Sequence, residues 1–294
     1  MTTSTAPVVV GIDGSDSAID AVRWAGAVAE KWGAPLRILH ALPTIGRNLT
    51  QTAGAMVAAM MSYQRDSADI FLKAASEAVS ADRPDLEVTT TSVNVPADEA
   101  LIAASQDARL VVLGGRPVSA TAALLVGSTA LAVATRAVCP VVAFRGDKVL
   151  PGTGSIVVGV DDSPAAESAL TTAFALADRL GSPLKVVRSM SIAAFETGVT
   201  IPLLIDWEGL EAADLAALTE TVDTHNKNHP SVEAKCFLEP VSPGKALLRH
   251  VYGADLVVVG TRGRNALAGA VLGSTSLNML HHSPVPVMVC HAKD

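Results

Sequence analysis

The chain repeats itself once, and this duplication limits the possible fold more than any other feature of the sequence. Three segments of the first half return in the second: Val8–Ser15 as Ile156–Ser163, Leu110–Gly114 as Leu256–Gly260, and Leu125–Thr129 as Val271–Thr275. The period, measured from Asp13 to Asp161 or from Gly114 to Gly260, is far longer than that of a solenoid repeat. The sequence therefore predicts two globular domains, 1–146 and 147–294, with Gly146–Gly154 as the connector.

Within each copy, short apolar strand patterns alternate with amphipathic helical patterns. The predicted strands of the first copy are Val8–Asp13, Leu36–Leu42, Leu86–Val93, Leu110–Gly114 and Val141–Phe144. Those of the second copy are Ile156–Asp161, Leu184–Arg188, Val232–Leu238, Leu256–Gly260 and Val287–Cys290. Such alternation predicts the α/β class, with two tandem doubly wound, Rossmann-like domains of five parallel strands each. Ligands of such sheets bind beyond the carboxyl ends of the strands, where the strand order reverses.

Composition excludes several kinds of partner. A hydrophobic content of 49% with only 3% aromatic residues predicts large aliphatic cores. The net charge of -7 leaves no excess of basic residues for binding nucleic acid, so we expect no nucleic-acid partner. No apolar run is long enough to span a bilayer, so we expect no membrane partner. The chain starts without a secretory leader pattern, and Cys139, Cys236 and Cys290 lack metal or disulfide spacing. These features favour a reduced, cytoplasmic location.

One stretch of the second copy has the parts of an anion cradle. The strand pattern Leu256–Gly260 leads into a loop with Gly263, and Gly273 and Ser274 precede a predicted helix, Thr275–His282. Glycines let the backbone approach a ligand, and the unpaired N–H groups of a helix start attract phosphate. We expect Ser274 at the N-cap of that helix, where its hydroxyl adds a donor. The alternative is a tight structural turn.

The spacing Gly-x2-Gly-x9-Gly-Ser, formed by Gly260, Gly263, Gly273 and Ser274, resembles the nucleotide-binding motif of the ATP-binding universal stress proteins. The resemblance covers both halves almost end to end. It implies strand order 3-2-1-4-5, ATP as a regulatory or stabilising ligand with Mg²⁺ held through its phosphates, and at most slow hydrolysis. It also implies an internal pseudo-dimer that forms a homodimer, and a role in stress or dormancy.

The resemblance also implies roles for further residues of this sequence. Asp161 and Asp13 match the aspartate that contacts the nucleoside, with Gly159 and Gly11 two residues earlier, and Ser189 and Ala41 match the position whose backbone holds adenine. The remaining candidate positions are the phosphate-loop residues of the two copies: Thr261, Arg262, Arg264 and Thr275 in the second, and Gly114, Gly115, Arg116, Gly127, Ser128 and Thr129 in the first. The structural alternatives are an aspartate that caps a helix, glycines that serve packing, and arginines that are merely solvated. Ser15 and Ser163 are better helix caps than the aspartates, which favours the ligand role for the aspartates.

The first copy departs from the motif at Pro117, which occupies the place of the second glycine. Proline has no N–H and a fixed φ, so it removes one phosphate donor and stiffens the loop. We therefore expect nucleotide binding by the first copy to be weaker than by the second.

Signatures of catalysis are missing from the sequence. Gly244-Lys245 matches the Gly-Lys pair of a P-loop, but the next residue, Ala246, lacks the hydroxyl that such a loop requires. An ATP-cleaving transferase would need a general base beside the phosphates, and the sequence offers no convincing one. The competing hypothesis to an ATP-binding protein is a nucleotide-independent, dimeric interaction scaffold of the same fold, which Pro117 supports for the first copy.

Overall fold

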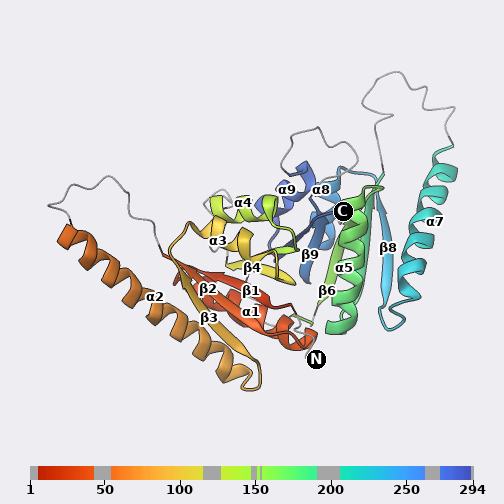
Figure 1. The fold of residues 1–294 in the computed structure, drawn as a ribbon. Coiled ribbons are helices and arrows are strands. Elements are labelled where there is room, and N and C mark those ends of the chain that lie inside the picture. The colour runs from red at the N-terminus through yellow and green to blue at the C-terminus, as the bar shows by residue number, and fades with distance from the viewer. Residues whose placement is uncertain are drawn as a thin grey trace. The chain divides into compact units, whose positions relative to one another are not determined.

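A computed structural model describes residues 6–42, 54–114, 127–146, 151–152, 154–190, 206–261 and 272–292 (Figure 1). The chain divides into two compact units, Met1–Leu150 and Pro151–Asp294, which are treated separately below. The repeat places the boundary after residue 146, whereas the division of the structure follows residue 150.

Each unit contains one parallel five-stranded sheet. The strands of unit 1 are β1 Val8–Ile12, β2 Leu36–Ala41, β3 Val88–Val93, β4 Leu110–Gly114 and β5 Val141–Phe144, in the order β3-β2-β1-β4-β5. Those of unit 2 are β6 Ser155–Val160, β7 Leu184–Ser189, β8 Ala234–Glu239, β9 Ala254–Gly260 and β10 Val287–Cys290, in the order β8-β7-β6-β9-β10. Both units therefore have the order 3-2-1-4-5, which confirms the predicted fold class. The strand order reverses between β1 and β4 in unit 1, and between β6 and β9 in unit 2.

Helices cover both faces of each sheet. Unit 1 has α1 Asp16–Trp32, α2 Gly54–Asp82, α3 Ala97–Ala104 and α4 Ser128–Arg136, and unit 2 has α5 Pro164–Leu180, α7 Trp207–Asn226, α8 Pro243–His250 and α9 Ser274–His282. In unit 1, α1 packs with α2 and α3 packs with α4; in unit 2, α5 packs with α7 and α8 packs with α9. Within the described ranges, no helix combines the length and the apolar character that a membrane span requires.

Local sequence signals determine where the first helix of each unit begins and ends. Ser15 and Ser163 are the N-caps of α1 and α5, and their side chains accept the N–H groups of Ala18 and Ala166. At the other end, α1 is followed by Gly33 with φ 60°, a left-handed conformation that glycine adopts without strain. The predicted serine caps are confirmed, so the aspartates at positions 13 and 161 are not needed as caps.

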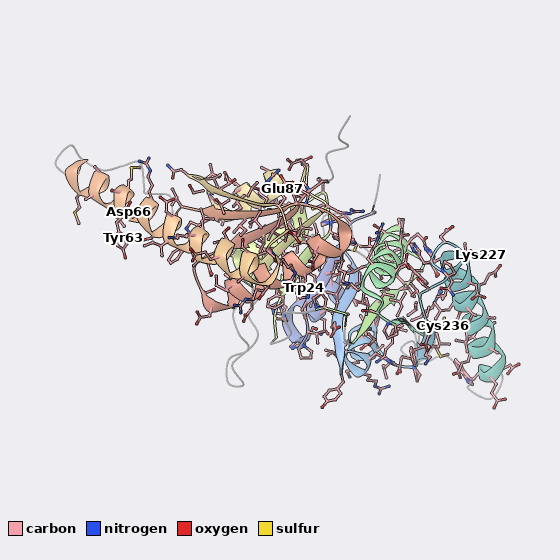
Figure 2. The ribbon with its side chains drawn as sticks, turned by 90° about the horizontal axis from the view of Figure 1, so that it is seen from below. Trp24, Tyr63, Asp66, Glu87, Lys227 and Cys236 are labelled. Atoms are coloured by element: carbon pink, nitrogen blue, oxygen red, sulfur yellow. The ribbon has the colours of Figure 1, made fainter. Side chains whose placement is uncertain are left out.

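The cores lie between sheet and helices and are mainly aliphatic. The inner strands are almost fully buried, and in unit 1 the ring of Trp24 on α1, labelled in Figure 2, lies 6.2 Å from that of Phe144 on β5. Cys139 and Cys290 are buried, and burial raises the pKa of the Cys139 thiol to about 11. These thiols act as small apolar groups, as expected from the sequence. In contrast, Tyr63 of α2 lies exposed on the surface (Figure 2).

Candidate functional site

Three neighbouring strands of unit 2 end at the candidate site. β6 lies between β7 and β9 and runs parallel to both, so their carboxyl ends meet at one edge of the sheet. Ser189 is the last residue of β7, Gly260 is the last of β9, and Asp161 follows β6 directly. In unit 1 the equivalent edge carries Ala41, Gly114 and Asp13. The topology thus brings the predicted residues Asp161, Ser189 and Gly260 to one edge of the sheet, beside the switch in strand order.

Asp161 and Asp13 both lie one residue beyond their strands, although the apolar pattern predicted them as the last strand residues. Oδ1 of Asp161 accepts the N–H of Ser163 at 3.0 Å. Oδ1 of Asp13 accepts the N–H of Ser15 at 3.0 Å and its hydroxyl at 2.5 Å. Each aspartate therefore shapes the turn between the first strand and the first helix. Asp161 is half-buried and Asp13 is exposed at the edge where a ligand would lie.

Packing explains several of the predicted glycines. A Cβ on Gly159 would lie 3.0 Å from Cδ1 of Leu247, and one on Gly11 would lie 2.9 Å from Cδ1 of Leu101. A Cβ on Gly260 would lie 2.7 Å from the backbone carbon of Ala165. Gly114 meets the same constraint from Ala18, whose Cα would lie 2.9 Å away. Because they lack a Cβ, these four glycines allow the neighbouring helices α8, α3, α5 and α1 to pack closely against the sheet. This packing role does not depend on a ligand.

The start of α9 differs from the prediction by one residue. Gly273 is the N-cap, with φ −72° and ψ 156°, and Ser274 is the first helical residue. The prediction of Ser274 as N-cap was wrong, because the carbonyl of Gly273 already accepts the first helical N–H, that of Leu277, at 3.0 Å. Unit 1 has the same arrangement, with Gly127 as N-cap and Ser128 as the first residue of α4.

The first turn of α9 is suited to binding an anion. Since the helical ladder begins with the N–H of Leu277, the N–H groups of Ser274, Thr275 and Ser276 have no partner within the helix. They point from the positive end of the helix dipole, where phosphate oxygens are favoured. In α4 the ladder begins with Leu131, so Ser128 and Thr129 are placed in the same way.

Gly127 is exposed and forms the N-cap of α4. Among the described residues, no atom would lie within 4 Å of a Cβ placed on it, and its φ of −59° is accessible to any residue. Packing against the described residues therefore does not require a glycine here, and glycine is among the residues that commonly occupy an N-cap.

Hydrogen bonds hold Thr261 and Gly273, two described residues near the ends of the predicted phosphate loop. The N–H of Thr261 donates to the carbonyl of Cys290 at 2.8 Å, and the N–H of Gly273 donates to the carbonyl of Thr261 at 2.6 Å. The hydroxyl of Ser276 donates to the carbonyl of Gly260 at 2.5 Å. Ser276 was not identified from the sequence. The N–H of Gly273 is bonded to Thr261 and therefore does not face outward.

Part of the predicted site falls outside the described residues. These positions are Arg262, Gly263 and Arg264 of the second copy, and Gly115, Arg116 and Pro117 of the first.

Ser189 has a structural task that the sequence did not show. Its hydroxyl donates to the carbonyl of Val241 at 2.5 Å, which ties the end of β7 to the segment before α8. The equivalent residue in unit 1, Ala41, lacks this group. The predicted adenine contact involves only the backbone and is compatible with this bond.

A cavity of about 280 Å³ adjoins the site on the side of α5 and α7. Asp161 lines it, together with Arg188, Leu218 and Thr221. Nη2 of Arg188 donates to Oδ1 of the exposed Asp162 at 2.6 Å, so this cation is already paired. The cavity lining shares only Asp161 with the predicted site and includes neither Gly260 nor Gly273.

Each unit thus has a doubly wound α/β fold in which a glycine-capped helix follows the fourth strand of the sheet. The sequence model of the Universal stress protein family matches residues 5–145 and 153–291. The chain belongs to this family and is a tandem member of it. A universal stress protein of Mycolicibacterium smegmatis is 30% identical over 287 residues, and one of Mycobacterium tuberculosis H37Rv is 31% identical over 296 residues; each alignment covers 96% of both chains.

Solved structures agree on the fold. The crystal structure of a universal stress protein from Archaeoglobus fulgidus matches with a TM-score of 0.73 and 21% identity, and the match covers 98% of this chain and 100% of that one. At this identity the likeness supports the architecture alone.

Proposed function

We propose that this tandem universal stress protein binds ATP, and that unit 2 provides the stronger site. The observation that carries the proposal is the convergence at the carboxyl edge of unit 2. There Gly273 caps α9, whose first N–H groups have no partner within the helix, while β9 ends at Gly260 and Asp161 directly follows β6. This is the arrangement that binds phosphate and nucleoside in doubly wound sheets.

Each group has a proposed task. The N–H groups of Ser274 and Thr275 bind phosphate oxygens together with the loop residues Thr261, Arg262, Gly263 and Arg264. Asp161 contacts the nucleoside, and the backbone of Ser189 contacts adenine. The corresponding residues of unit 1 form a weaker site because Pro117 removes a donor.

Mg²⁺ would be held through the phosphates of ATP. Among the described residues, no three His, Cys, Asp or Glu side chains are grouped so that they could hold a metal ion. Mg²⁺ usually keeps several waters and is bound through one or two carboxylates together with the phosphates of its nucleotide.

We propose that ATP acts as a regulatory or stabilising ligand during stress or dormancy, in a cytoplasmic homodimer with hydrolysis slow at most. A ligand that binds only the folded chain stabilises it according to ligand concentration and affinity. Light scattering of the pure protein with and without ATP tests the assembly.

A second candidate is a dimeric interaction scaffold that binds no nucleotide. It is favoured by the packing of Gly11, Gly159, Gly114 and Gly260, which accounts for these glycines without a ligand. It does not account for Gly263, Gly273 and Ser274, which complete the motif of unit 2.

Mass spectrometry of small molecules released from the denatured pure protein separates the two candidates, together with calorimetric titration of ATP. Co-purified adenine nucleotide or saturable ATP binding supports the first. No released nucleotide and no heat of binding supports the scaffold.

A further inference from the structure

The sheet of unit 1 ends in an edge strand that no charge protects. Among the described residues, β3 pairs with β2 alone. The four central residues of β3 are exposed, and the strand contains neither a charged residue nor a proline; these four residues are Thr89, Thr90, Thr91 and Ser92. Edge strands usually carry such a residue, because their open row of N–H and carbonyl groups otherwise pairs with another strand.

The corresponding edge strand of unit 2 is protected in this way. β8 lies at the other end of the strand order and carries Lys235, whose side chain is 67% exposed. Lys235 pairs in register with Lys185 of β7, and Thr89 holds the same place in unit 1, in register with Arg37 of β2. The two copies therefore differ at this edge, and only β8 has a charge that discourages the addition of a strand.

The bonds to β2 show which backbone groups of β3 face the open edge. The carbonyls of Glu87 and Val93 accept the N–H groups of Leu36 and Leu42. Backbone groups alternate in direction along a strand, so the odd-numbered residues of β3 bond to β2. Thr90, like the other even-numbered residues of β3, therefore directs its N–H and its carbonyl toward the open edge.

A second copy of β3 is complementary to this edge. An antiparallel pair about a two-fold axis at Thr90 places this residue opposite its own copy and Thr89 opposite Thr91. Threonine pairs across neighbouring strands are favourable. Glu87 then lies opposite Val93, so no like charges meet at the end of the strand.

The helix beside β3 carries apolar side chains that no described residue covers. α2 packs against β3 and runs alongside it (Figure 1). Met56, Met60, Tyr63 and Ile70 are between 53% and 78% exposed, and their spacing puts them on one side of the helix. A two-fold axis perpendicular to the sheet keeps both copies of α2 on the same face of the joined sheet, next to each other. A pair of short strands is smaller than the roughly 800 Å² per partner of a stable interface, and α2 supplies further apolar area.

We infer that unit 1 contains the homodimer interface of this protein. β3 pairs with β3 of a second copy in antiparallel orientation, and the two copies of α2 pack together over that pair. The inference rests on the proposed homodimer, whose surface it names, and does not depend on the binding of ATP.

The test uses charge variants of the full chain. Since Thr90 lies opposite its own copy, Thr90→Lys and Thr90→Glu each bring like charges together at the axis, whereas an equimolar mixture brings opposite charges together. Sedimentation velocity over a concentration series measures the dissociation constant of the dimer. We expect each variant alone to raise this constant at least about tenfold, and the mixture to return it to within about threefold of wild type. The control is Thr224→Lys, at an exposed position of α7, which should leave the constant unchanged.

Hydrogen exchange of the wild type is an independent measurement that needs no variant. The amides of Val88, Thr90 and Ser92 should be protected in the dimer and should exchange faster on dilution, because pairing at the edge covers them.

The outcomes separate this inference from the proposed homodimer. If the wild type dimerises and neither Thr90 variant weakens the dimer, this surface is wrong and the homodimer stands. Failure of the mixture to restore the dimer, or exchange at these amides that is independent of concentration, also overturns the strand pairing. If the wild type is monomeric over the whole range, the homodimer and this inference fail together, while the proposed binding of ATP is unaffected.

Discussion

Asp161 has one observed and one proposed role, which a single substitution can separate. Its Oδ1 accepts the N–H of Ser163, and we propose that the carboxylate also contacts the nucleoside. Asp161→Asn keeps an acceptor oxygen for the turn and removes the charge. We expect ATP affinity to fall about tenfold, since a hydrogen bond to a charged group contributes about 1.5–3 kcal/mol, while the thermal midpoint without ligand changes little.

The control for Asp161 is its neighbour Asp162, which is exposed and bonded to Arg188. Asp162→Asn should leave ATP affinity unchanged in the same titration. Equal affinity losses for the two variants would point to general electrostatics and would remove Asp161 from the site.

Single residues were predictable where their partners are close in sequence. Ser15 and Ser163 cap helices that start directly after them, so their sequence positions were sufficient. Ser274 was placed one residue out because a glycine can cap a helix with its backbone alone. Ser276 could not be recognised, because its partner Gly260 lies sixteen residues earlier on another element.

At the scale of elements, Asp255 holds the first residues of unit 2 through two hydrogen bonds. Its side chain is 3% exposed, and Oδ2 accepts the N–H groups of Gly152 and Gly154 at 2.9 and 2.6 Å. Asp255→Ala leaves both donors without this partner. We expect the free energy of unfolding of unit 2 to fall by about 2–4 kcal/mol in urea titration.

The comparison for Asp255 is Asp107→Ala, which removes an exposed ion pair with Arg37 at 3.2 Å. Exposed pairs contribute little, so its loss should stay below about 1 kcal/mol. A loss from Asp255→Ala that is no larger than that of the control would show that the connector is held by other contacts.

Glu239 joins the end of β8 to α8 through two bonds. Oε1 lies 2.8 Å from Nε2 of His250, and Oε2 accepts from Nη1 of Arg249 at 2.7 Å. These bonds, that of His250 first, hold the pKa of Glu239 below its ordinary value of 4.5. The stabilisation is therefore fully present above pH 4.5 and is lost as the pH falls through the lower folded-state pKa.

Urea titrations between about pH 3 and pH 6 test this link. Wild type should be more stable than Glu239→Gln near pH 6, and the difference should shrink toward pH 3. Glu233→Gln, which removes an exposed pair with Lys235, should show little difference at any pH. A constant gap between wild type and Glu239→Gln would contradict the assignment.

Most elements were predicted to within two residues because the apolar pattern of a buried parallel strand is local. Val141–Phe144 and Val287–Cys290 match the prediction, whereas β3 begins at Val88 instead of Leu86. The exposed threonines of β3 give a weak pattern, so its start was uncertain. Strand order depends on contacts distant in sequence and came only from the family resemblance, which the topology confirms.

At the scale of the whole molecule, duplication produced two units of one fold, and we propose that their nucleotide sites are unequal. Unit 2 keeps every residue of the glycine motif and adds the hydroxyl of Ser276. Unit 1 has Pro117 in the loop and Ala130 in place of that serine. We therefore predict that the ATP affinities of the two units differ by about one to two decades, because unit 1 lacks one or two of the hydrogen bonds to phosphate or to the loop.

The central claim is that the chain binds ATP chiefly in unit 2, and calorimetric titration of ATP into three full-length proteins tests it most directly. These are wild type, Gly273→Val and Gly127→Val. The two glycines are the N-caps of α9 and α4, and both have backbone conformations that valine can adopt. In the proposed sites, a valine side chain at either position would crowd the backbone N–H groups that bind phosphate. We predict that Gly273→Val abolishes the tight site and that Gly127→Val leaves it intact. Loss of tight binding in Gly127→Val but not in Gly273→Val, or no ATP binding by the wild type, would contradict the account.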